Sequence, residues 1–356
     1  MGKGYLIENK DLNEAARIFL EELFNNEIIE AVIAQKENVK GKGAFHYLLK
    51  KDELDGVKPF IPFMPENAAS VVSRFTREKP SLKPVAVILR PCELRALVEL
   101  VKFNQANLEN IILVGIDCLG TYDNIDFQKE PNDFPRDNSR LRSACQRCMT
   151  PEPLVADIKL SFLGEENGLW VIPASEKGQE ILKKLGYELK DVPETREKKI
   201  KEIEEERRKL RAQKFESLEK NFTRIERFTE FFAYCLNCKN CMEACPICFC
   251  KECFFKSPAL TWDSEVYLRK LESKGGFRMP EDPIFFHLGR LVHVTPSCVG
   301  CGICEQACPV DIKVGLVFNY LSEKVQEAFG YTAGRSLDEK PILTTFKEDE
   351  LIDLVW

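Results

Sequence analysis

Eight cysteines in the C-terminal third of the chain repeat one spacing twice. The first copy runs Cys235-x2-Cys238-x2-Cys241-x3-Cys245-Pro246, and the second runs Cys298-x2-Cys301-x2-Cys304-x3-Cys308-Pro309. In bacterial ferredoxins with two [4Fe–4S] clusters, three thiolates of each motif bind one cluster and the fourth binds the other cluster. The spacing therefore predicts two ligand sets. They are Cys235, Cys238, Cys241 and Cys308 for one cluster, and Cys298, Cys301, Cys304 and Cys245 for the other.

A pair of zinc knuckles is the alternative interpretation of these cysteines. Knuckles pair two C-x2-C elements, whereas each copy here is a triplet followed by a Cys-Pro. The spacing thus favours clusters, which carry out one-electron transfer. Because the fourth ligands cross over, we expect the two clusters to lie close together.

Four further cysteines lie in the first half of the chain. Cys92 follows the apolar run Val85–Leu89, and Cys118 follows the run Ile111–Ile116. If these runs are parallel strands, both thiols lie at the carboxyl edge of the sheet, where α/β folds usually bind ligands. The pair Cys145-x2-Cys148 supplies two more thiols. Together the four favour a third [4Fe–4S] cluster over isolated buried cysteines.

Segments around these four cysteines resemble a known family. They read Leu89-Arg90-Pro91-Cys92, Val114-Gly115-Ile116-Asp117-Cys118, and Cys145-Gln146-Arg147-Cys148 followed by Leu154-Val155-Ala156-Asp157-Ile158. They are similar to the beta subunit of coenzyme F420-reducing hydrogenase and of related formate dehydrogenases, over most of residues 1–225. The resemblance implies one [4Fe–4S] cluster held by Cys92, Cys118, Cys145 and Cys148, beside a flavin.

The chain departs from this family where the flavin is expected. In the family, the first long helix opens with a Gly-Gly pair and a Thr, which let the backbone approach the cofactor. The equivalent stretch here is Asp11-Leu12-Asn13-Glu14-Ala15-Ala16. A carboxylate near a diphosphate repels it, so we expect little or no tightly bound FAD.

Three cysteines remain, namely Cys248, Cys250 and Cys253, directly after the first motif. Three thiols in six residues suit a further metal, provided that His287 or His293 supplies a fourth ligand. We prefer the alternative that these three cysteines pack around the cluster as soft apolar side chains.

The remaining sequence predicts the elements that position these cysteines. Residues 1–193 alternate helical and strand-like patterns, which predicts an α/β domain with a mixed or parallel sheet. Residues 194–232 are rich in Glu, Lys and Arg and predict a long connecting helix, mainly solvated. Residues 233–330 form the α+β or α-rich ferredoxin-like domain, with a helix over Val314–Phe329, and residues 331–356 form a tail.

Composition limits the classes of function. The net charge of −6 argues against a nucleic-acid partner, and no apolar run approaches the length of a membrane span. We expect no targeting segment and a cytoplasmic protein, where thiols stay reduced, so that 15 cysteines indicate metal ligands rather than disulfides.

The predicted function is electron transfer within an anaerobic oxidoreductase complex. The resemblance implies partner subunits of formate dehydrogenase, hydrogenase or heterodisulfide-reductase type. Two hypotheses compete: a non-catalytic relay through about three [4Fe–4S] clusters, and a flavin subunit that splits the hydride of F420 or NAD(P)H into single electrons. The departure at Asp11–Ala16 favours the relay.

Overall fold

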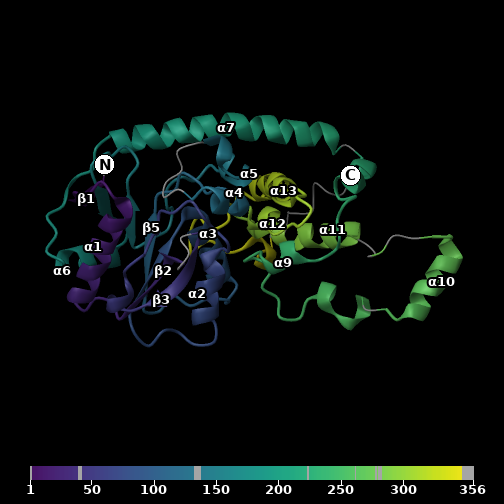
Figure 1. The fold of residues 1–356 in the computed structure, drawn as a ribbon, viewed down its shortest axis with the longest axis horizontal. Helices are drawn as coiled ribbons and strands as arrows, with labels where there is room; N and C mark the ends of the chain where they lie inside the picture. Colours follow the sequence, from purple (N-terminus) through teal and green to yellow (C-terminus); the bar gives the residue numbers. More distant parts are fainter. Residues whose placement is uncertain are drawn as a thin grey trace.

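The N-terminal part of the chain is built on one mixed sheet. The computed structural model describes residues 2–38, 42–131, 138–222, 224–260, 262–276, 279 and 283–346. The sheet has eight strands in the order β3-β2-β4-β5-β6-β7-β1-β8 (Figure 1). The strands are β1 (Lys3–Ile7), β2 (Ala31–Glu37), β3 (Ala44–Leu49), β4 (Val85–Leu89), β5 (Ile111–Ile116), β6 (Ile158–Ser161), β7 (Leu169–Pro173) and β8 (Lys190–Asp191).

The centre of the sheet is parallel and its edges are antiparallel. Strands β2, β4, β5 and β6 run parallel, whereas β3, β7, β1 and β8 pair antiparallel with their neighbours. Every residue of β4 and β5 is buried, as expected for continuous apolar runs covered on both faces. The expected strands are confirmed, and so is the α/β class with a mixed sheet.

Helices cover both faces of the sheet. On one face, α1 (Leu12–Asn25) and α6 (Glu176–Lys184) share a core with the start of α7 (Thr195–Asn221). On the other face lie α2 (Ala68–Thr76) and α3 (Pro91–Lys102). The other α-helices of the described ranges are α4 (Asn124–Lys129), α5 (Ser143–Gln146), α8 (Ile225–Phe231), α9 (Asn240–Glu243), α10 (Ser264–Lys274), α11 (Pro283–Val294), α12 (Ile303–Gln306) and α13 (Val314–Ala328).

The charged segment forms a long helix that ends earlier than expected. Helix α7 ends at Asn221, and α8 follows after a break. The break brings the Phe222 ring against Phe228 and Phe231, with centroids 6.0 and 5.3 Å apart. Most residues of α7 are exposed, but one side of the helix buries residues along its length, including Ile203 and Phe215.

Helix α7 spans both halves of the molecule, as Figure 1 shows. Near its start, Arg196 pairs with Asp117, which follows β5. Further along, Arg211 forms an ion pair with Glu323 of α13. None of the helices in the described ranges is long and apolar enough to cross a bilayer.

The two cysteine motifs adopt the same loop, which makes them a structural repeat. Residues Asn237 and Lys239 of the first motif have φ of 51° and 64°, and the equivalent Gly300 and Gly302 have 71° and 72°. A short helix follows in each case, α9 in the first motif and α12 in the second. These two helices lie against each other. The C-terminal region is thus ferredoxin-like and rich in helix.

Candidate functional site

The sheet brings Cys92 and Cys118 to one edge. Strands β4 and β5 are parallel neighbours, with Leu89 opposite Gly115. Cys92 lies in the first turn of α3, immediately after β4, and Cys118 follows β5 by two residues. Helix α3 begins at Pro91, whose missing N–H costs nothing at that position. The two thiols therefore lie where the sequence placed them.

Cys145 and Cys148 join these two thiols. The pKa of Cys118 is raised to about 11, mainly by burial; Arg90 opposes the rise, and the neighbouring thiols of Cys145 and Cys148 contribute to it. Burial likewise raises the pKa of Cys92, with contributions from Cys118 and Cys148. Interactions of this kind act between near neighbours. The structure thus brings Cys145 of α5 and Cys148, shortly after it, near the two thiols that follow β4 and β5; these four cysteines are called the strand-end set below.

Cys145 is held by hydrogen-bond donors. The Arg142 Nε atom lies 3.3 Å from Cys145 Sγ, and the Thr121 N–H donates to the same sulfur at 3.3 Å. Burial raises the pKa of Cys145, but the charge and hydrogen bond of Arg142 and the hydrogen bonds from Thr121 together outweigh burial, so the pKa lies below the ordinary value. Donors to sulfur favour the thiolate, which is the form that binds iron.

The first ferredoxin set contains the crossed-over ligand that the motif predicts. Cys235, Cys238 and Cys241 of the first motif line one cavity together with Cys308 of the second motif. Two of these sulfurs accept backbone N–H groups at 3.3 Å, Cys235 from Asn237 and Cys308 from Ile312. Cys308 therefore lies beside the three cysteines of the first motif.

The second set shows the reciprocal arrangement. Burial raises the pKa of Cys304, and the thiols of Cys301 and Cys298 add to the effect. Cys245 of the first motif interacts with Cys304 as well as with its own neighbour Cys248. Cys304 also lies behind Gly315, where an added Cβ would stand 3.2 Å from its sulfur.

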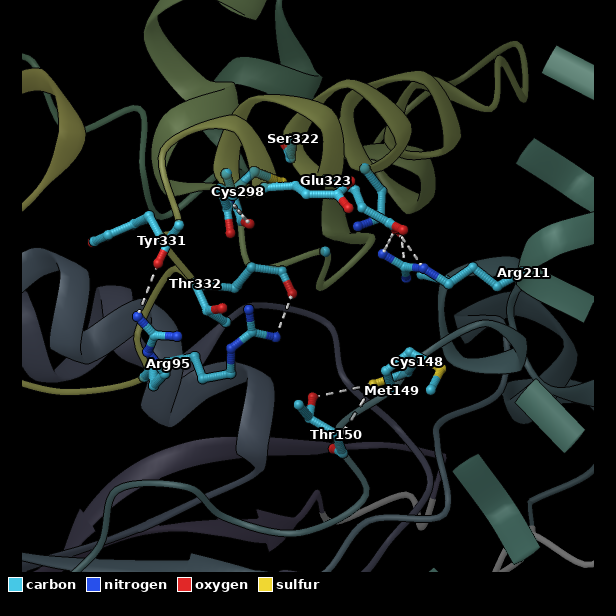
Figure 2. A pocket seen from close by; sticks show the side chains of 18 residues that line it. Arg95, Cys148, Met149, Thr150, Arg211, Cys298, Ser322, Glu323, Tyr331 and Thr332 are labelled. Carbon is cyan, nitrogen blue, oxygen red and sulfur yellow. Dashed lines mark hydrogen bonds and ion pairs between the residues drawn. The ribbon is translucent and has the colours of Figure 1, made fainter. Parts of the chain in front are cut away.

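The cysteine sets follow one another from the sheet edge to α11. The strand-end set and the second set are neighbours, since the Cys301 thiol contributes to the raised pKa of Cys92. The loop of the second motif packs on α5, so that a Cβ at Gly302 would lie 2.2 Å from the Cβ of Ala144. Cys148 and Cys298 also line one cavity of about 460 Å³ (Figure 2). The second set in turn meets the first through α9 and α12.

Arginines frame the cavity between Cys148 and Cys298. Figure 2 shows Arg95 and Arg211 on its walls. Arg95 Nη1 donates to the Val299 carbonyl at 3.2 Å, and Arg211 Nη1 donates to the Arg147 carbonyl at 3.2 Å. These side chains join the second motif and α7 to the α/β domain.

Helix α11 supplies two contacts to the first set that the motif spacing did not reveal. Arg290 is buried, and its Nη1 lies 3.1 Å from Cys241 Sγ. His287, one turn earlier, places Nε2 3.3 Å from Cys235 Sγ and stacks on the Phe232 ring. The signal in the sequence was weak: a His and an Arg three residues apart in an otherwise apolar helix.

Hydrogen-bond donors surround the sulfurs of the cysteine sets. In the part of the chain that the structure describes, no three His, Cys, Asp or Glu side chains stand at the spacing of ligands to one metal ion. The donors are thiols with N–H groups directed at several sulfurs, which is the environment that clusters use.

The start of α1, where the family places its flavin, is already occupied by protein groups. The Asp11 carboxylate accepts the N–H groups of Asn13 and Glu14 at 2.9 and 3.2 Å. The Asn13 Oδ1 atom accepts the Phe60 N–H at 3.1 Å. The amides that would face a phosphate are thus partly used by the N-cap.

A cavity nevertheless lies beside this helix start. It measures about 600 Å³ and is lined by Asp11, Asn13, Leu119 and Lys199 among others. A second cavity of about 410 Å³ shares Leu119 and Lys199 with it and continues along α7. Leu119, which lines both cavities, directly follows Cys118 in the chain.

The three remaining cysteines differ in exposure. Cys248 and Cys253 are half-buried, but Cys250 is exposed. Packing around a cluster as apolar side chains, the interpretation that we preferred from the sequence, does not describe Cys250.

Comparisons with known proteins agree with the cysteine pattern. The 4Fe-4S binding domain family matches residues 292–313, which contain the second motif. The chain is 25% identical over 377 residues to the F420-dependent formate dehydrogenase subunit beta of Methanocaldococcus jannaschii, covering 92% of this chain and 93% of the relative. It is 27% identical over 384 residues to the F420-dependent formate dehydrogenase 1 subunit beta of Methanococcus maripaludis, covering 95% of each.

A solved structure, the F420-reducing [NiFe] hydrogenase complex from Methanosarcina barkeri, matches 60% of this chain and 92% of its own chain. The TM-score is 0.47 at 13% identity, which carries no conclusion about function. The two sequence relatives, in contrast, extend over both cysteine-bearing regions. The resemblance expected from the cysteine segments is thus confirmed: over 92% of its length the chain is similar to a formate dehydrogenase beta subunit, and it carries a 4Fe-4S binding domain in its C-terminal part.

Proposed function

We propose that this chain is the iron–sulfur electron-transfer subunit of an anaerobic oxidoreductase complex of formate dehydrogenase type. One observation carries the proposal most directly, namely the continuous series of cysteine sets from the sheet edge to α11, joined through Cys92 and Cys301. Bound [4Fe–4S] clusters supply one-electron transfer at potentials that the protein tunes.

The proposed ligands are those of the sequence motifs. Residues from the sheet edge hold one cluster, and the crossed ferredoxin sets hold two. The sets are Cys92, Cys118, Cys145 and Cys148; Cys298, Cys301, Cys304 and Cys245; and Cys235, Cys238, Cys241 and Cys308. The protein contributes N–H donors to the sulfurs, buried arginines beside Cys145 and Cys241, and a water-excluding shell.

The proposed partner is a formate dehydrogenase catalytic subunit, since both curated relatives are named as subunits of such enzymes. We assign residues 1–193 to the domain with the strand-end set, residues 194–232 to the connecting helices and residues 233–330 to the two ferredoxin sets. Residues 331–356 form the tail, and the cytoplasm is the proposed location.

We further propose that the chain acts as a relay without tightly bound flavin. The support is local: Asp11 caps α1 with its own carboxylate, and Glu14 pairs with Arg17. The second candidate is a flavin subunit that exchanges a hydride with F420 or NAD(P)H. The cavity of about 600 Å³ beside α1 favours it, because Leu119, the chain neighbour of Cys118, and Lys199 line that cavity.

Anaerobic purification of the chain with its catalytic partner tests both statements. On addition of formate, the relay predicts reduced-cluster EPR signals in a complex whose acid extract contains no FAD above trace. A complex whose clusters stay oxidised with formate would contradict the electron-transfer proposal. One FAD per chain would instead establish the flavin subunit and leave the cluster assignments intact.

A further inference from the structure

Three cysteines outside the cluster sets and one histidine line a single small cavity beside α11. Cys248, Cys250 and Cys253 come from the segment after the first motif, and His293 comes from the last turn of α11. The cavity measures about 50 Å³. Four metal-binding side chains thus meet in one place, although Cys248 and His293 lie 45 positions apart in sequence.

These side chains have few other roles in the described structure. Cys250 and His293 are exposed, and the Cys253 Sγ atom has a long contact of 3.9 Å with Met242 Sδ. Cys248 Sγ lies 3.8 Å from Arg290 Nη2 and also contacts the Cys245 thiol, so it is the most engaged of the four donors. Solvent thus reaches two of the four donors, while the other two lie deeper.

We propose that Cys248, Cys250, Cys253 and His293 bind one zinc ion. Three thiolates and one imidazole are a common donor set of structural zinc, which prefers four ligands in a tetrahedron. A cubane is the poorer fit, because the fourth donor is an imidazole and the three sets of four cysteines already account for the other thiols.

Closure of the site requires small side-chain movements. Within the described ranges, three such donors do not already stand at the spacing of a single ion. Cys250 and His293 are exposed, so their side chains are the ones that would turn toward the half-buried Cys248 and Cys253 in the shared cavity. In many small metal sites, the ligands reach their final positions only when the metal ion binds.

The ion would fix α11 against the first motif. His293 lies on the helix that carries Arg290 and His287, whose side chains contact the sulfurs of Cys241 and Cys235. A zinc ion between His293 and the segment 248–253 closes that helix onto the loop that follows Cys245. The inference concerns a structural metal and does not depend on the direction of electron flow or on the identity of the partner.

Metal analysis of the full chain tests the proposal. We expect about one zinc per chain after dialysis against a chelator, in addition to the cluster iron. Cys250→Ser, Cys253→Ser and His293→Ala should each lose most of this zinc while iron and acid-labile sulfide stay unchanged. Lys251→Ala, an exposed change in the same loop, is the matched control and should keep the zinc.

Cobalt substitution gives a second measurement that does not rely on variants. The cobalt-loaded chain should show thiolate-to-metal charge transfer and the intense visible bands of a tetrahedral ion, and these should weaken in His293→Ala. Absence of chelator-resistant zinc, or zinc retained by all three ligand variants, would overturn the proposal. An additional four irons per chain that disappear in Cys250→Ser would replace the zinc ion with a fourth cluster.

Discussion

Replacing Arg290 should lower the reduction potential of the cluster proposed at Cys241. The guanidinium is buried, and its Nη1 lies 3.1 Å from Cys241 Sγ. Reduction adds negative charge to the cluster, and a nearby positive charge stabilises that state. The Arg290→Met variant removes the charge but keeps a long apolar side chain against the Phe286 and Phe318 rings, which lie 5.5 and 4.8 Å from the guanidinium carbon.

The size of the shift follows from Coulomb's law. A unit charge about 7 Å from the added electron is worth roughly 2.4 kcal/mol at an effective dielectric constant of about 20, which equals about 100 mV for one electron. We therefore expect Arg290→Met to shift one midpoint potential negative by about 100 mV. Arg290→Lys keeps the charge and should shift it much less.

An anaerobic redox titration followed by EPR measures these potentials. Arg142→Met provides a matched variant, since Arg142 donates to Cys145 of the strand-end set in the same way. Arg142→Met should lower the midpoint potential of the cluster proposed at Cys145 and leave that of the cluster proposed at Cys241 unchanged. A potential that stays the same in Arg290→Met, or rises, would refute the assignment of Arg290 to a cluster. A shift of the same midpoint by both variants would refute the separation of the two sets.

Two further predictions concern the ligand exchange and the contact between domains. Cys245→Ala should damage the cluster held mainly by the second motif, and Cys308→Ala should damage the cluster held mainly by the first. EPR spectra of each variant show which cluster is damaged. Damage confined to the cluster of the variant's own motif would contradict the crossover. Gly302→Ala should lower the free energy of unfolding by more than Gly330→Ala. Both glycines have positive φ, which costs about 1–2 kcal/mol with a Cβ, but only Gly302 also meets Ala144. Chemical denaturation compares the two, and equal losses would show that the packing on α5 is unimportant.

The elements that carry the cysteines could be predicted because they follow from patterns within short stretches of sequence. The apolar runs before Cys92 and Cys118 are long and uninterrupted, so they form parallel strands that end at one edge. The motif spacing likewise predicts which fourth cysteine each set receives. The side-by-side position of Cys308 and Cys241 in the structure agrees with that rule.

Features that depend on tertiary contacts were not visible in the sequence. Nothing in the composition of residues 194–232 marks the end of α7 at Asn221, because the break arises from packing of Phe222 on α8. The contacts of Arg290 and His287 depend on how α11 docks on the first motif. Helix docking depends on side chains from distant segments, and periodicity within one segment does not report it.

Counting iron and acid-labile sulfide in the anaerobically purified chain tests the central claim most directly. Three cubanes predict about 12 irons and about 12 sulfides per chain, with Mössbauer spectra of cubane type only. A value near eight of each, unchanged in Cys92→Ala and Cys118→Ala, would show that the strand-end cysteines hold no cluster and would contradict the continuous relay.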